Sequence, residues 1–222
     1  MSGRPFDLGL YVGRFQHFHI GHQAVLDQAL LMCDRVLVLV GSSQEQGTLR
    51  NPYSAATRIE MIREIYPYAD LNVLIHTLPD LSGPDDITPE WGRHVLQAVK
   101  QITRKLPEMM IYGNDEARSA WFDPQDIATV SEVIISRYLN NISATQMRSY
   151  LLRADEQKYA DLWHKHAHPR LHKHFDRLRG ELLRANAYAD ISRRLAHRDP
   201  TWHDKGDWLD RALRGAPVFG EA

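Results

Sequence analysis

The fold is decided by the stretch Gly13-Arg14-Phe15-Gln16-His17-Phe18-His19-Ile20-Gly21-His22. A short apolar run, residues 8–12, comes directly before it, and an apolar-periodic segment, residues 24–33, follows it. This order predicts a strand, a tight loop and the start of a helix. Because the first N–H groups of a helix are unpaired and its N-terminus carries partial positive charge, such a turn binds anions readily. The stretch therefore predicts a phosphate-binding turn.

Two histidines and a glycine indicate the chemistry of this turn. His19 and His22 are three residues apart on the first turn of the predicted helix, so their side chains would share one face and reach the same ligand. Gly21 lies between them and has no side chain, which would let a nucleotide approach the backbone closely. We therefore expect this face to bind the phosphates of a nucleotide.

Four more strands are expected after the first, and helical patterns separate them. A strand is expected over residues 35–40, where an arginine is followed by a continuous run of leucine and valine that is typical of a strand buried on both faces of a parallel sheet. The later strands are expected at residues 71–76, 107–112 and 132–135. Five strands alternating with helices predict an α/β fold with a Rossmann-like, doubly wound, parallel five-stranded sheet.

The chain divides into two predicted regions. Residues 1–154 are expected to form the Rossmann-like domain, and residues 155–222 a C-terminal helical extension and tail. Residues 155–195 have a helical pattern that Pro169 is expected to interrupt.

Composition narrows the class of protein. Of the 222 residues, 43% are hydrophobic and 25% are charged, which indicates a globular protein. The formal net charge of −1 gives no support for nucleic-acid binding. The N-terminal residues lack an apolar signal core, and no apolar run approaches the roughly 18 residues that span a membrane, so we expect a cytoplasmic protein. The single cysteine, Cys33, is expected to fill the core on the apolar face of the first helix.

A second helix start shares the features of the first. The sequence Ser143-Ala144-Thr145-Gln146-Met147-Arg148 places a capping serine ahead of a helical pattern. Thr145 and Arg148 are three residues apart on its first turn, and a hydroxyl and a guanidinium both suit phosphate oxygens. We therefore expect two helix N-termini to hold one polyphosphate.

Four separated motifs carry a resemblance to a known family. They are Gly-Arg-Phe-Gln with His-Ile-Gly-His, Gly-Ser-x-Gln at residues 41–44, Asn-Pro-Tyr at 51–53 with an arginine nearby, and Ile-Ser-x-Thr-x-x-Arg at 142–148. Over residues 8 to about 185 the chain resembles the archaeal-type nicotinamide mononucleotide (NMN) adenylyltransferases of the HxGH nucleotidyltransferase superfamily. The same module forms the N-terminal half of bifunctional NMN adenylyltransferase/Nudix hydrolases. No Nudix motif occurs here, so hydrolase activity is not expected.

The resemblance implies transfer of AMP from ATP to the 5′-phosphate of NMN, giving NAD and pyrophosphate. Its catalytic residues would be His22, His19, Arg14 and Arg148. Its ATP-binding residues would be Gly13, Arg14, Phe15, His19, Gly21, His22, Asn114, Ser143, Thr145 and Arg148. Its NMN-binding residues would be Arg50, Asp80 and Trp91. Mg²⁺ would be bound with ATP and not by a protein cage. The implied partners are ATP, NMN and NAD, with no nucleic acid and no membrane, and we expect a homo-oligomer.

Several of these residues have a simpler interpretation. Arg50 could be a solvated loop residue, Trp91 could fill the core, and Asp80 and Asn114 could each belong to a turn. Arg58, a few residues after the Asn-Pro-Tyr motif, could equally be a surface helix residue.

Two histidine features also stand out. The group His164, His166, His168, His172 and His174 could suggest zinc, but no cysteine joins it, so a solvated or interface helix face is favoured. His17 stands where the family usually has proline, which predicts a softer loop with activity retained.

Two other functions remain open. Another HxGH nucleotidyltransferase could use nicotinate mononucleotide, phosphopantetheine or FMN as acceptor, although Gly-Arg-Phe-Gln in the first loop argues against most of these. A non-catalytic nucleotide-sensing module is the alternative from a different class, and the intact histidine and Ser-x-Thr-x-x-Arg motifs argue against it. A class I aminoacyl-tRNA synthetase is not expected because the chain has no Lys-Met-Ser-Lys-Ser stretch.

Overall fold

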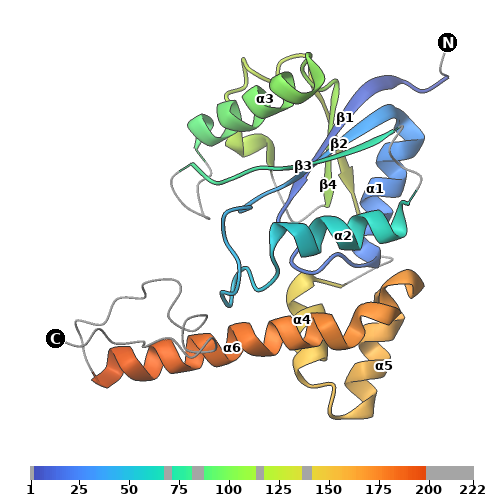
Figure 1. Ribbon diagram of the computed structural model, residues 1–222. Helices are drawn as coiled ribbons and strands as arrows, with labels where there is room; N and C mark the ends of the chain where they lie inside the picture. Colours follow the sequence, from blue (N-terminus) through green and yellow to red (C-terminus); the bar gives the residue numbers. More distant parts are fainter. Residues whose placement is uncertain (1–2, 68–71, 82–87, 114–117, 137–141, 199–222) are drawn as a thin grey trace.

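A computed structural model describes residues 3–67, 72–81, 88–113, 118–136 and 142–198. Its centre is a five-stranded sheet in the order β3-β2-β1-β4-β5 (Figure 1). The strands are β1 (Phe6–Gly13), β2 (Cys33–Val40), β3 (Val73–Thr77), β4 (Met109–Gly113) and β5 (Ser131–Ile135). All neighbouring strands are parallel, which confirms the predicted α/β class.

The strand order places the loop after β1 at a functionally important position. From β1 the chain moves outward through β2 to β3, and it then returns to the other side of β1 to form β4 and β5. Ligands of open α/β sheets bind outside the carboxyl ends of the strands at such a reversal. The loop that begins at Gly13 leaves β1 at this point.

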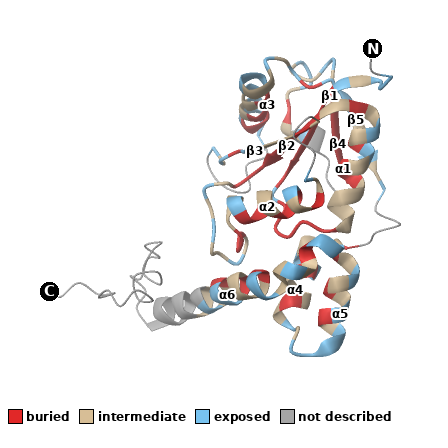
Figure 2. Ribbon diagram, turned by 45° about the vertical axis from the view of Figure 1, so that its right-hand side comes forward, coloured by how far each residue is buried: buried red, intermediate tan, exposed pale blue. Residues whose placement is uncertain are grey.

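Helices cover both faces of the sheet. Alternate residues of β2 explain this: Val36, Val38 and Val40 belong to one core, while Leu37 and Leu39 belong to the other. Helices α1 (Ile20–Met32) and α2 (Ala55–Ile65) pack on the valine side, and α3 (Pro89–Thr103) packs on the leucine side. Figure 2 shows that buried residues are concentrated in the central strands.

The C-terminal helices share the core of the valine side. They are α4 (Ala144–Leu152), α5 (Gln157–His166), the 3₁₀ helix η3 (Pro169–His174) and α6 (Phe175–Arg198). Met147, Trp163 and Leu178 are fully buried in the same cluster as Val38 and Met61. The predicted interruption at Pro169 is confirmed, since η3 begins there. The boundary at residues 154/155 falls between α4 and α5, which pack together (Figure 1), so the two-region division stays a prediction.

The position expected for Cys33 is wrong. Cys33 does not lie on the apolar face of α1, because it is the first residue of β2 and its N–H closes the helix by donating to the carbonyl of Ala29. The thiol is nonetheless buried, 3.9 Å from the sulfur of Met109. Burial raises the pKa of Cys33 to about 11, as expected for an inert core residue. No helix in the described ranges is long and apolar enough to cross a membrane.

Candidate active site

The loop after β1 is compact and mostly buried. Phe15 adopts a left-handed backbone conformation with φ of 52°, which is uncommon for an aromatic residue. Its ring is 2% exposed and meets those of Tyr11 and His22 edge to face. A Cβ atom at Gly13 would lie 2.8 Å from the Phe15 ring, so the glycine is required for this packing. The loop therefore has a defined shape in which aromatic packing holds a strained backbone.

His19 and His22 lie together at the start of α1, as the sequence predicts. His19 is the N-cap residue, and its Nδ1 accepts a hydrogen bond from the N–H of Gly21 at 3.1 Å. The two imidazole rings stack with centroids 3.9 Å apart. A Cβ atom at Gly21 would lie 3.0 Å from the His19 ring, so a side chain at this position would press on the imidazole. This effect is additional to the close nucleotide approach expected from the sequence.

The first turn of α4 is joined to the same loop. Arg148 donates through Nη1 to the carbonyl oxygen of Gln16 and through Nη2 to the hydroxyl of Thr145, the latter at 3.3 Å. Burial lowers the pKa of Arg148, although a guanidinium of this kind stays protonated at neutral pH. The two helix starts that the sequence singles out are thus connected through one arginine.

Ser143 works here as a helix cap. Its hydroxyl accepts from the N–H of Gln146 at 3.2 Å, and the Gln146 side chain accepts from the N–H of Ser143 at 2.8 Å. This reciprocal capping box fixes the first turn of α4. The capping role that the sequence predicts for Ser143 is therefore confirmed, and phosphate binding by its hydroxyl stays a prediction.

Arg58 supports the site from a buried position, so its interpretation as a surface helix residue is wrong. Its side chain is fully buried, and it donates to the carbonyl oxygens of Gly41 at 2.6 Å, Arg14 at 2.8 Å and Ser42 at 3.1 Å. One guanidinium therefore joins the loops that follow β1 and β2. A signal was present in the sequence, because Arg58 precedes Met61 and Ile62 by three and four residues on α2 and so shares their buried face.

A side-chain amide reinforces the same connection. The amide of Gln16 donates to the carbonyl of Tyr53 and accepts from its N–H, both at 3.0 Å. The loops also meet directly, since the N–H of Gly41 donates to the carbonyl of Gly13 at 2.9 Å. The carboxyl-end loops of β1 and β2 thus form one hydrogen-bonded unit.

The three predicted NMN-binding residues lie in or near neighbouring loops. Arg50 is partly buried in the loop between β2 and α2. Asp80 follows β3 and pairs with Gln44, whose amide donates to its carboxylate at 3.0 Å and accepts from its N–H at 3.1 Å. Trp91 is 6% exposed, lies in the core on the α3 side and contacts the ring of His94. Their role in binding NMN stays a prediction, and Asn114 lies outside the described residues.

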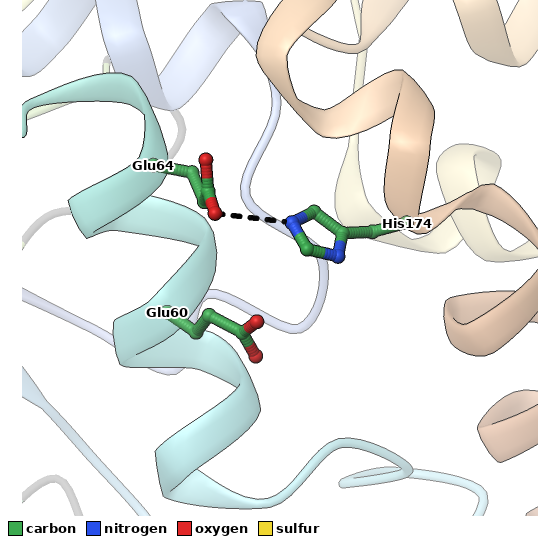
Figure 3. Close-up of side chains that lie close together, drawn as sticks. All are labelled: Glu60, Glu64 and His174. Atoms are coloured by element: carbon green, nitrogen blue, oxygen red, sulfur yellow. Dashed lines mark ion pairs between the residues drawn. The ribbon is translucent and has the colours of Figure 1, made fainter.

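A group of potential metal ligands lies between α2, which carries two glutamates, and η3, which ends at a histidine. Glu60, Glu64 and His174 each present one ligand atom, and these atoms lie within 4.8 Å of one another (Figure 3). The carboxylates already have cationic partners: Lys173 lies 2.9 Å from Glu64, and Arg177 lies 2.8 Å from Glu60. We interpret this group as an ion-pair cluster that joins α2 to η3 and α6.

The histidine-rich segment is mostly an aromatic cluster. His164 stacks on Phe175 with centroids 5.2 Å apart, and His172 meets His164 at 4.7 Å. Both rings pack around Trp163. Of the five histidines, His174 is the one that meets carboxylates, which the sequence did not indicate because Glu60 and Glu64 are more than 100 residues away.

His17 does not give the softer loop that its substitution for proline predicts. The side chain is fully buried, and its Nε2 accepts a hydrogen bond from the indole N–H of Trp163 at 3.1 Å. Its ring also meets that of Tyr53 edge to face. The loop is held at this position by side-chain contacts where proline would restrict the backbone.

Comparisons with known proteins agree with this architecture. Two curated archaeal relatives are each named nicotinamide-nucleotide adenylyltransferase. The protein from Methanolobus tindarius is 26% identical over 67% of this chain and 79% of its own. The protein from Methanothrix thermoacetophila is 43% identical over 48% of this chain and 57% of its own. The aligned part is 32% of the length of the relative from Saccharolobus solfataricus, which has the same name and is 54% identical over 25% of this chain.

A solved structure supports the fold. The bifunctional NMN adenylyltransferase/ADP-ribose pyrophosphatase of Francisella tularensis, crystallised with AMP and a manganese ion, superposes with a TM-score of 0.61. It is 20% identical, and the superposition covers 88% of this chain and 57% of that one. The family model described as cytidylyltransferase-like matches residues 10–168, well over half of the sequence. The chain belongs to the cytidylyltransferase-like family.

Proposed function

We propose that this chain is a nicotinamide-nucleotide adenylyltransferase, which transfers AMP from ATP to the 5′-phosphate of NMN and releases NAD and pyrophosphate. The observation that carries the proposal is the pairing of His19 and His22 at the start of α1, with Arg148 of α4 bonded to the loop ahead of them. Donors from two helix N-termini suit the several phosphates of a nucleotide better than a single anion. The names of the archaeal relatives point to the same reaction.

The reaction is a direct phosphoryl-group substitution. An oxygen of the NMN phosphate forms a bond to the α-phosphorus of ATP, and the bond from that phosphorus to the bridging oxygen of the β-phosphate breaks. Pyrophosphate leaves with the electron pair, so no covalent intermediate on the protein is needed. Positioning and electrostatic stabilisation therefore supply most of the catalysis.

The proposed catalytic roles follow from the position of each group. His22 and His19 would donate to the phosphate oxygens on which charge develops, while Arg14 and Arg148 would neutralise charge on the polyphosphate. The proposed ATP-binding residues are Gly13, Arg14, Phe15, His19, Gly21, His22, Asn114, Ser143, Thr145 and Arg148. Arg50, Asp80 and Trp91 are proposed for NMN.

Mg²⁺ is the proposed metal, and it would enter with ATP. The side chains proposed to meet the phosphates are imidazoles, guanidinium groups and hydroxyls, and none of them is the carboxylate through which proteins usually bind Mg²⁺. The ion would therefore be held through the nucleotide and water, and it would neutralise charge on the ATP oxygens. Removal of divalent ions with EDTA should abolish turnover, and added Mg²⁺ should restore it.

A panel of acceptors tests the proposal most directly. The protein is incubated with ATP and Mg²⁺ together with NMN, nicotinate mononucleotide, phosphopantetheine or FMN, and both pyrophosphate and the dinucleotide product are measured. NAD and pyrophosphate in equal amounts are expected with NMN. Turnover with another acceptor alone would refute the substrate, and binding of ATP without any turnover would favour a nucleotide-sensing module. A homo-oligomeric state and a cytoplasmic location stay predictions.

A further inference from the structure

We infer that Trp163, on helix α5, is a positioning residue for the loop between β1 and α1 and acts through its hydrogen bond to His17. The inference rests on the proposed adenylyl transfer, because the loop that Trp163 positions leads into the start of α1, where the proposed catalytic residues His19 and His22 lie. Trp163 and His17 are 146 residues apart in the sequence, and both side chains are fully buried. The bond therefore connects the C-terminal helices to the centre of the candidate site.

The donor of this bond determines which tautomer His17 adopts. An indole N–H can only donate, so the Nε2 atom of His17 must accept and carries no hydrogen. The hydrogen of the neutral ring is then on Nδ1, which lies 2.5 Å from the carbonyl oxygen of Phe18. Each ring nitrogen has one partner of the right kind, and together these two bonds fix the orientation of the imidazole.

The fixed ring in turn fixes the backbone ahead of the catalytic pair. The carbonyl that accepts from His17 belongs to Phe18, the residue directly before His19. On the other side of His17, the carbonyl of Gln16 accepts from Arg148. The segment that leads into α1 is therefore held from α4 at Gln16 and from α5 at His17. A small rotation here would move the His19 imidazole and the first turn of α1 together.

Trp163 is itself held in place by the C-terminal helices. Its indole meets the ring of Phe175 edge to face with centroids 5.1 Å apart, and it also contacts His172. It is among the largest fully buried side chains of the residues that the structure describes. The helices α5, η3 and α6 thus form a fixed base for the indole N–H.

Replacing Trp163 by phenylalanine separates positioning from packing. Trp163→Phe keeps an aromatic ring in the core but removes the donor, which leaves the Nε2 atom of His17 buried without a partner. The imidazole can then rotate or change tautomer to regain one, and the Phe18 carbonyl loses its donor as it does so. A displacement of about 1 Å in a catalytic group is enough to cost up to about 100-fold in rate.

The experiment measures kcat and KM in the full-length chain for Trp163→Phe, His17→Phe and the double variant. Trp121→Phe, the same substitution on the opposite side of the sheet, serves as the matched control. All assays are run well below the unfolding temperature of each variant, with folding verified by circular dichroism. We expect kcat of Trp163→Phe to fall about tenfold, while the control stays within twofold of wild type.

The double variant tests whether the two residues act as one unit. If Trp163 acts through His17, the loss in the double variant should equal the larger single loss instead of the product of the two. Multiplicative losses would overturn the inference, and so would an unchanged kcat in Trp163→Phe. A purely structural role for Trp163 would lower the unfolding temperature and leave kcat of the folded protein unchanged.

A spectroscopic readout does not depend on turnover. Nitrogen-15 NMR of labelled histidine should show His17 protonated on Nδ1 in the wild type and should show a changed tautomer population in Trp163→Phe. If the wild type makes no NAD, the proposed function fails, and the positioning of His17 is judged by this signal alone. An identical His17 signal in the wild type and the variant would contradict the hydrogen bond and overturn the inference.

Discussion

The imidazole rings of His19 and His22 stack with centroids 3.9 Å apart and planes inclined by 29°. The two histidines do not have equal roles in the fold. His19 also caps α1, because its Nδ1 accepts from the N–H of Gly21. The neutral ring that makes this cap carries its hydrogen on Nε2, a donor suited to a phosphate oxygen. His19 therefore combines a structural and a proposed catalytic role, and His22 is the cleaner test of catalysis.

His22→Ala should lower turnover by roughly two orders of magnitude or more, which is the effect of removing one donor to a charged transition state. The half-buried His22 packs against Phe15 and Phe18 and does not cap the helix, so the fold should persist. Steady-state kinetics with ATP and NMN provide the measurement. His76→Ala removes an exposed imidazole from β3 and should leave turnover unchanged. An unaltered rate in His22→Ala would remove this residue from the mechanism.

Substitutions at His19 should separate its two roles. Asparagine is a good N-cap and should keep the free energy of unfolding close to that of wild type, while alanine should lower it by about 1 kcal/mol. Both variants lack the imidazole, so both should lose turnover to a similar degree. Urea denaturation and steady-state kinetics on the same preparations make the comparison. If His19→Asn retained full activity, the imidazole would have no role beyond capping.

Arg58→Met should lower the free energy of unfolding by roughly 3 kcal/mol or more. The substitution removes a charged donor from four buried or partly buried carbonyl oxygens and leaves them without that partner. Arg63→Met is the matched control, since Arg63 is exposed on the same helix, and it should change stability by less than about 0.5 kcal/mol. Equal losses of unfolding free energy in the two variants would show that the buried hydrogen bonds of Arg58 stabilise the fold no more than an exposed arginine does.

Features that neighbouring residues determine could be predicted from the sequence, whereas features that depend on distant residues could not. The valine and leucine run of β2 predicts a strand covered on both faces because side-chain alternation is a local property of the chain. The two histidines at the start of α1 are likewise local, as their spacing alone places them on one face. Arg58 and His17 depend on partners contributed by distant segments: three loop carbonyls for the arginine and an indole N–H from α5 for the histidine. No short-range pattern contains those partners, so the hydrogen bonds of these two polar side chains could not be anticipated, although the spacing of Arg58 from Met61 and Ile62 indicated that it lies on the buried face of α2.

Acidification should destabilise the protein through His17. Burial of its ring, with a smaller contribution from the nearby charge of Arg148, lowers the pKa of His17 from its ordinary value of 6.5 to about 4. Between these two pH values the unfolded chain binds a proton that the folded protein excludes. The stabilising contribution is therefore complete above about pH 6.5 and is lost as the pH falls toward 4, a change of roughly 3 kcal/mol.

The contribution of His17 can be isolated by comparison with His17→Phe, which has no group that titrates at this position. His166 and His168 also have lowered pKa values through burial, so the wild type alone would report a sum of several groups. Urea denaturation of both proteins at pH 7.5, 6, 5 and 4.5 should show a shallower loss of stability in the variant. The difference should grow steadily as the pH falls, because each step of acidification protonates more of the unfolded wild-type chain at residue 17. Parallel curves of unfolding free energy against pH for the two proteins would mean that the folded protein binds a proton at His17 as readily as the unfolded chain does. Protonation of Nε2 would then break the hydrogen bond from Trp163 over the same pH range.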